Sequence, residues 1–135
     1  MCRVLVVEDQ SDTREGIAEL LAGEGHLCST ACNGQEALEW LTAQAELPCL
    51  ILLDLRMPVM DGWDFLRAVR LVEKWQKIAI VVVSAAVERA APKPVLPAKA
   101  FWPKPLGTEH IAALHHYCDQ HRDSWVAKAI GSSAP

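Results

Sequence analysis

The chain has 135 residues, 51% of them hydrophobic, and a formal net charge of -4 at pH 7. This length suits one domain, which we place at residues 1–130, with a disordered tail over 131–135. Negative charge and the lack of a lysine and arginine cluster argue against nucleic-acid binding, because phosphate backbones are bound through concentrated positive charge. The apolar run Val4–Val7 is too short for a signal peptide or a membrane span, so we expect a cytoplasmic protein without membrane contact.

Apolar segments of strand length alternate along the chain with segments of helical period. The expected strands are Val4–Val7, Leu27–Ala31, Leu50–Leu53, Ile78–Val83 and Ala98–Trp102. Three of them have almost no polar residue, which is typical of strands that are covered on both faces. The alternation predicts an α/β fold in which helices cover both faces of a parallel sheet.

Cap residues mark where the helices between these strands begin. Polar residues of the kind that caps a helix precede each segment of helical period. We expect caps at Ser11 or Asp12, Asn33, Asp61-Gly62 and Thr108. In the last helix, Ile111 and Leu114 should face the core.

Three prolines interrupt the crossover between the fourth and fifth strands. Pro92, Pro94 and Pro97 each remove a backbone donor, and proline disfavours helix in the residue before it. The fourth helix is therefore expected to be short or missing, with irregular chain over residues 91–98.

The cysteines and histidines do not predict a metal site. The five cysteines include no CxxC pair and lie in or beside apolar segments, so we interpret them as buried, reduced thiols. Four histidines crowd the last helix, but they are mostly five residues apart, whereas helical ligand pairs need a spacing of three or four. We expect a solvated helix face that carries His110, His115, His116 and His121.

Acidic and polar residues stand at the ends of the expected strands. Glu8 and Asp9 end the first strand, Asp54 the third and Ser84 the fourth, and Lys104 follows the fifth. The carboxyl ends of parallel strands share one edge of a sheet, where ligands of open α/β folds bind. We therefore expect these side chains to form one site.

Three carboxylates at one point repel each other unless a cation lies among them. A hard divalent ion with oxygen ligands satisfies them, and Mg²⁺ is the ion we expect, with Lys104 adding a fixed positive charge. Once the charge on an incoming phosphoryl group is neutralised, Asp54 can attack in line and form an acyl phosphate. Ser84 would donate its hydroxyl to a phosphoryl oxygen.

The motifs at these positions resemble those of receiver domains of two-component response regulators. They occur in order over about residues 3 to 122, and they are Val4 to Asp9, Leu52 to Gly62, Val83-Ser84-Ala85 and Lys104-Pro105. The resemblance implies a flavodoxin-like receiver fold, which is a doubly wound five-stranded parallel sheet in the order 2-1-3-4-5. It also implies a cis bond at Lys104-Pro105.

The resemblance assigns a role to each candidate residue. It makes Asp54 the phosphoacceptor, Lys104 the lysine that pairs with the phosphoryl group, and Ser84 the switch hydroxyl. Phe101 matches an aromatic residue whose rotamer couples to that hydroxyl. The implied metal ligands are Glu8, which acts largely through water, Asp9, Asp54 and the backbone carbonyl of Arg56.

The leading hypothesis is a stand-alone phosphoacceptor receiver in two-component or phosphorelay signal transduction. The resemblance implies a histidine kinase or histidine phosphotransferase domain as the phosphate donor, Mg²⁺ as the cofactor and a downstream protein target. It leaves a monomer and a homodimer both open. Such a module is not a turnover enzyme, although slow autodephosphorylation is expected.

Two other functions stay open on the sequence alone. A receiver-like scaffold or dimerisation module would work without phosphorylation, and the degenerate fourth helix permits this. An aspartyl-phosphate phosphatase or mutase of another α/β family would normally carry a second aspartate two residues after the nucleophile, where Arg56 stands.

The surface that passes the signal on is a further hypothesis. A partner could recognise the proline-rich residues 91–98 through their preformed geometry. Exposed tryptophans could anchor a partner, while ordinary partial burial is the alternative for the same residues, Trp40, Trp75 and Trp102.

Overall fold

The sheet is parallel throughout in the computed structural model, which describes residues 2–84 and 100–117. Its order is β2-β1-β3-β4-β5, so the expected topology is confirmed. The strands are β1 (Arg3–Val7), β2 (Leu27–Ala31), β3 (Leu50–Asp54), β4 (Ala79–Ser84) and β5 (Ala100–Pro103). Each lies within two residues of the apolar run that predicted it.

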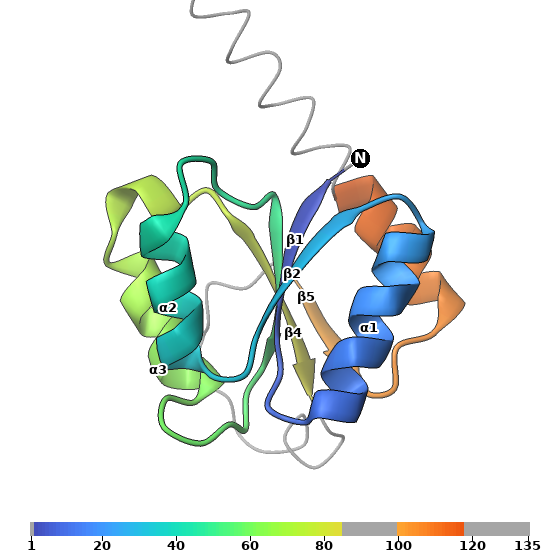
Figure 1. Cartoon of the computed structure of the whole chain (residues 1–135), viewed down its shortest axis with the longest axis horizontal. Coiled ribbons are helices and arrows are strands. Elements are labelled where there is room, and N and C mark those ends of the chain that lie inside the picture. The colour runs from blue at the N-terminus through green and yellow to red at the C-terminus, as the bar shows by residue number, and fades with distance from the viewer. Residues whose placement is uncertain (1, 85–99, 118–135) are drawn as a thin grey trace, which may run out of the picture.

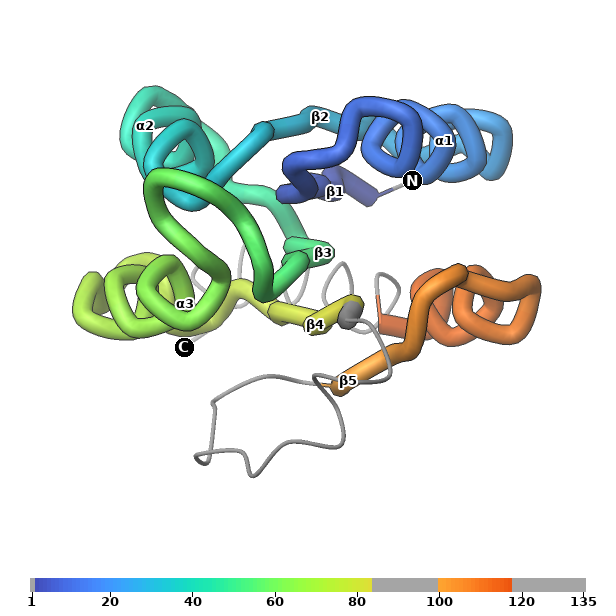
Figure 2. Tube along the Cα trace, turned by 90° about the horizontal axis from the view of Figure 1, so that it is seen from below, coloured from blue at the N-terminus to red at the C-terminus, as the bar shows by residue number. Residues whose placement is uncertain are grey.

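Helices cover both faces of this sheet (Figures 1 and 2). One face carries α2 (Gly34–Ala43), α3 (Gly62–Arg70) and the short 3-10 helix η1 (Glu73–Trp75). The other face carries α1 (Ser11–Gly23) and a helix over residues 108–117. This is the doubly wound arrangement that the sequence predicts. The expected fourth helix, the irregular segment 91–98 and the tail 131–135 lie outside the described residues.

Two apolar cores form because successive side chains of a strand point to opposite faces. Leu5 and Ile51 belong to the core under α2 and α3, and Val4 belongs to the core under α1. Ile111 and Leu114 are buried in the second core, as predicted. Each fully buried side chain of this kind contributes roughly 1.5–3 kcal/mol, so both layers of helices are held firmly against the sheet that carries the site.

Side-chain caps start α2 and α3 as expected. Asn33 Oδ1 accepts a hydrogen bond from the backbone N–H of Glu36 at 2.8 Å. Asp61 Oδ1 accepts one from the N–H of Asp64 at 2.9 Å. These caps satisfy backbone donors that the first helical turn leaves without partners.

The other two expected caps are wrong. Ser11 is already helical, and Gln10 stands at the cap position of α1, where its side chain makes no capping hydrogen bond within the described chain. The last helix begins at residue 108, and Gly107 precedes it. The Gly107 carbonyl accepts hydrogen bonds from the N–H groups of His110 and Ile111.

The three tryptophans are buried or partly buried rather than exposed. Trp75 and Trp102 are 6% and 8% exposed, and Trp40 is partly buried against the core under α2. Exposed tryptophan anchors at positions 75 and 102 are therefore a wrong expectation.

The described cysteines are reduced, as expected, but burial differs among them. No disulfide joins Cys2, Cys28, Cys32 and Cys49, which are the cysteines within the described residues. Cys2 is buried and the other three are partly exposed. Burial raises the pKa of Cys28 to about 11, which keeps this thiol protonated at neutral pH. Cys118 lies outside the described part of the chain.

The loop after β3 rests directly on the start of α2. The N–H of Gly34 donates to the carbonyl of Met60 at 3.0 Å. A Cβ atom at position 34 would lie 2.7 Å from Met60 Cγ and 2.9 Å from the Met60 carbonyl oxygen. Only glycine fits this contact without moving the loop. Val59, next to Met60, has a φ of 70°, in the left-handed region that is strained for a β-branched residue.

Replacing Gly34 should therefore destabilise the fold. We expect Gly34→Ala to lower the free energy of unfolding by about 1–3 kcal/mol, because the added methyl group overpacks the contact with Met60. Gly16→Ala is the matched control, since nothing lies within 4 Å of a Cβ there. In the exposed part of α1 it should stabilise by up to about 1 kcal/mol. Urea denaturation measures both, and equal effects would contradict the tight contact at Gly34.

Candidate functional site

Three carboxylates and one ammonium meet at the carboxyl edge of the sheet. Glu8 directly follows β1, Asp9 comes next in the loop before α1, and Asp54 ends β3. One carboxylate oxygen from each lies within 4.8 Å of the others. Lys104 reaches them from the loop after β5. The structure thus brings together four of the residues that the sequence singled out.

The Lys104 ammonium lies between two buried carboxylates. Nζ donates to Glu8 Oε1 and Oε2 at 2.9 and 3.2 Å, and it lies 3.3 Å from Asp54 Oδ1. Glu8 and Asp54 are only 2% and 5% exposed. Burial acts to lower the pKa of Lys104, but the hydrogen bond with Glu8 and the charges of both carboxylates outweigh it and raise that pKa overall. The Lys104-Pro105 bond is cis, as the family resemblance implied.

Asp54 is crowded by like charge. Burial raises its pKa to about 7, hydrogen bonding to Glu8 and the Glu8 charge act in the same direction, and Lys104 acts against them. The single positive charge of Lys104 does not neutralise three carboxylates. A divalent cation would add the missing positive charge, and Mg²⁺ prefers oxygen ligands and keeps several waters. The donor set therefore fits Mg²⁺, and binding would compete with the proton on Asp54.

Arg14 holds the backbone of the acidic pair, a contact that sequence reasoning missed. Its Nη1 donates to the Glu8 carbonyl at 2.9 Å and to the Asp9 carbonyl at 3.3 Å. Arg14 stands in the first turn of α1, from which a long side chain can reach back over the preceding loop. That position was the available sequence signal. These hydrogen bonds hold in place the backbone that carries the Glu8 and Asp9 carboxylates.

Gly62 lets α3 begin against the backbone of Asp54 and Leu55. Its N–H donates to the Leu55 carbonyl at 2.9 Å. A Cβ atom there would lie 2.7 Å from Leu55 Cα and would overlap the Asp54 carbonyl oxygen. Together with the Asp61 cap, this contact shapes the loop that contains Arg56.

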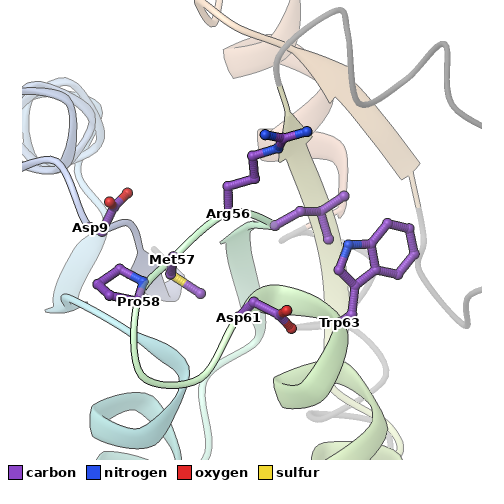
Figure 3. A pocket seen from close by; sticks show the side chains of 7 residues that line it. Asp9, Arg56, Met57, Pro58, Asp61 and Trp63 are labelled. Atoms are coloured by element: carbon purple, nitrogen blue, oxygen red, sulfur yellow. The ribbon is translucent and has the colours of Figure 1, made fainter.

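An open pocket of about 550 Å³ adjoins the carboxylates (Figure 3). Asp9 lies on one side, Asp61 and Trp63 lie on the other, and the loop over residues 55–58 runs between them. Since Asp9 belongs both to the pocket and to the carboxylate cluster, the pocket connects the cluster to solvent.

The remaining candidate residues have a place in the fold, while their roles stay predictions. Ser84 ends β4 and is paired with Pro103 in β5, and its side chain lies outside what the structure describes. Phe101 is partly exposed in β5 and is paired with Val82. Arg56, two residues after Asp54, has an exposed side chain.

Comparison with known proteins identifies the family. The response regulator receiver domain model matches residues 4–115, so the chain belongs to this family. Sporulation initiation phosphotransferase F of Bacillus subtilis (strain 168) is 28% identical over 109 residues, covering 81% of this chain and 86% of that protein. DNA-binding transcriptional regulator NtrC of Escherichia coli (strain K12) is 32% identical over 124 residues, covering 88% of this chain and 26% of that protein.

Solved structures agree with this assignment. Response regulator TrrA from Thermotoga maritima, in complex with Mg(2+)-BeF, superposes with a TM-score of 0.75 and 27% identity, covering 87% of this chain and 99% of that one. Receiver domains are in general signalling modules rather than enzymes. The chain spans less than two thirds of the length of several curated relatives, 61% of one and 26% of NtrC. Among the described residues, no helix is long and apolar enough to cross a membrane.

Proposed function

We propose that this chain accepts a phosphoryl group at Asp54 from the phosphohistidine of a histidine kinase or a histidine phosphotransferase domain. One observation carries the proposal: the buried Asp54 carboxylate lies 3.3 Å from Lys104 Nζ, and one of its oxygens lies within 4.8 Å of oxygens of Glu8 and Asp9. Membership of the receiver family supports it. We extend the receiver domain over residues 1–130.

The carboxylates and one carbonyl would hold Mg²⁺. The ligands we assign are Glu8, largely through water, Asp9, Asp54 and the Arg56 carbonyl. The metal bound in the TrrA complex supports this choice of ion. Mg²⁺ supplies charge neutralisation for the phosphoryl oxygens when bound.

The transfer is an in-line displacement. An oxygen of ionised Asp54 forms a bond to phosphorus, while the bond from phosphorus to the donor nitrogen breaks and that nitrogen keeps the electron pair. Lys104 would turn its ammonium from Asp54 to a phosphoryl oxygen, and the Ser84 hydroxyl would donate to another. Hydrolysis of the product returns the chain to its starting state, and we expect it to be slow.

The change at Asp54 would reach partners through β4 and β5. A phosphoryl group adds roughly -1.5 to -2 charges and three acceptor oxygens, which would attract the Ser84 hydroxyl. Phe101 lies one strand away and would follow that movement. We further propose that a downstream protein recognises the phosphorylated form through residues 91–98 or through another face. The proposal allows either a monomer or a homodimer.

Phosphorylation is tested by intact mass. With Mg²⁺ and acetyl phosphate the protein should gain one phosphoryl group, and Asp54→Asn should gain none. Removing Mg²⁺ with a chelator should abolish labelling of the unaltered protein. Asp61→Asn is the matched control, because the asparagine oxygen keeps the α3 cap and labelling should continue. No adduct, or an adduct that survives Asp54→Asn, would contradict the proposal, and the first outcome would favour a phosphorylation-independent scaffold.

The switch is tested by fluorescence. Trp102 is buried next to Phe101 and stacks on Tyr117 with ring centroids 6.0 Å apart. Beryllium fluoride with Mg²⁺ should change its emission, and Phe101→Ala should reduce that change while binding persists. Trp63 lines the pocket and can also respond to binding. The difference in emission change between the unaltered protein and Trp102→Phe gives the contribution of Trp102. Saturable binding with unchanged Trp102 emission would argue against coupling through β5.

A further inference from the structure

Two histidines and a glutamate join the turn between α1 and β2 to the last helix. His26 Nε2 lies 3.0 Å from His115 Nδ1, and His115 Nε2 lies 3.3 Å from Glu24 Oε2. His26 is 7% exposed, and the side chains of His115 and Glu24 are 37% and 48% exposed. Since His26 directly precedes β2, the cluster lies at the amino edge of the sheet, opposite to Asp54. Figure 1 shows α1 and the helix over residues 108–117 side by side on this face.

The two imidazole rings do not have the geometry of a straight hydrogen bond. A straight N–H···N bond of the observed 3.0 Å would hold the ring centroids about 5.3 Å apart, because hydrogen bonds prefer angles above about 150°. The centroids of His26 and His115 are 4.7 Å apart, and the ring planes are inclined by 37°. The contact between His26 Nε2 and His115 Nδ1 is therefore bent, whichever ring carries the proton.

One metal ion bound by both nitrogens would give the same separation. Two imidazole nitrogens at about 2.1 Å from an ion and 3.0 Å from each other make roughly a right angle at the ion, which places the ring centroids about 4.6 Å apart. This agrees with the observed 4.7 Å. The exposed side of His115 leaves room for water to complete the coordination.

Glu24 stands where a supporting carboxylate stands in histidine metal sites. A ligating histidine usually donates its second ring N–H to a carboxylate, which fixes the tautomer. Donation from His115 Nε2 to Glu24 would leave the lone pair on Nδ1, the nitrogen that faces His26. The chain thus supplies two nitrogen ligands and an orienting group.

We propose that His26 and His115, oriented by Glu24, bind one divalent transition-metal ion of the Cu²⁺ or Ni²⁺ type. Imidazole ligands suit these ions, and a right angle between two nitrogens fits their square or octahedral geometry better than the tetrahedral geometry of Zn²⁺. Mg²⁺ takes oxygen ligands and stays at the acidic cluster. The bound ion ties the α1–β2 turn to the last helix and stabilises the fold at the edge remote from phosphorylation.

Ni²⁺ is the probe that tests this site. It is titrated by calorimetry into tag-free protein that is kept reduced, in buffer with saturating Mg²⁺ so that the acidic cluster is occupied. We expect one Ni²⁺ per chain and a rise of several degrees in the unfolding temperature. His115→Ala and His26→Gln should abolish both effects, and Glu24→Gln should weaken Ni²⁺ binding about 10- to 100-fold.

Two controls separate this site from other metal binding. His116→Ala removes the neighbouring histidine on the same helix and should leave Ni²⁺ binding unchanged. Glu24→Gln alters a half-exposed side chain, so the test survives a failure of His26→Gln to fold. No saturable Ni²⁺ binding would overturn the proposal, as would binding that persists in His115→Ala or that is equally strong in Glu24→Gln.

Discussion

The ammonium of Lys104 between the buried carboxylates of Glu8 and Asp54 is the interaction on which the rest of the site depends. Burying two carboxylates without a counter-charge would be strongly destabilising, because each loses its hydration. Lys104 lies 96 residues after Glu8 in the chain, in the loop that follows the edge strand β5. The strand order therefore has a direct chemical consequence, since it brings the loops after β1, β3 and β5 to one point.

This interaction leaves the site incompletely neutralised. Three carboxylates face one ammonium, and burial with the neighbouring Glu8 raises the pKa of Asp54 to about 7. The repulsion among these carboxylates destabilises the metal-free fold and also favours binding of a hard divalent cation. Arg14 binds the backbone of Glu8 and Asp9, and Gly62 packs on the backbone at the end of β3, so the backbone under all three carboxylates is held in place. This arrangement supports the proposed phosphoacceptor role of Asp54.

The fold and most of the site could be predicted from the sequence because both follow from local patterns. Apolar runs place the strands, and parallel strands bring their carboxyl ends together, so Glu8, Asp9 and Asp54 had to converge. Ser84 was placed at this edge by the same pattern, whereas its switch role and the role of Phe101 came from the family resemblance. The caps of α1 and the last helix were mistaken, because serine, aspartate and threonine favour cap positions without being confined to them.

Features that depend on contacts between distant segments could not be predicted. Spacing along the last helix does not pair its histidines with each other, but His115 contacts His26 in the turn before β2. Close packing of Gly34 on Met60 and burial of Trp75 and Trp102 likewise arise only when helices dock on the sheet. Periodicity shows which face of an element is apolar, but not which residue it meets.

Mg²⁺ binding should displace the proton that the crowded Asp54 carboxyl holds. Calorimetric titration of the metal-free protein with Mg²⁺, in buffers of different ionisation enthalpy, counts the protons released. Because the Asp54 pKa is raised to about 7, Asp54 is mostly protonated at about pH 6 and mostly ionised at about pH 8.5. Displacement of this proton predicts release of most of one proton at the lower pH, almost none at the higher pH, and tighter Mg²⁺ binding as pH rises. Equal proton release at both pH values would contradict it.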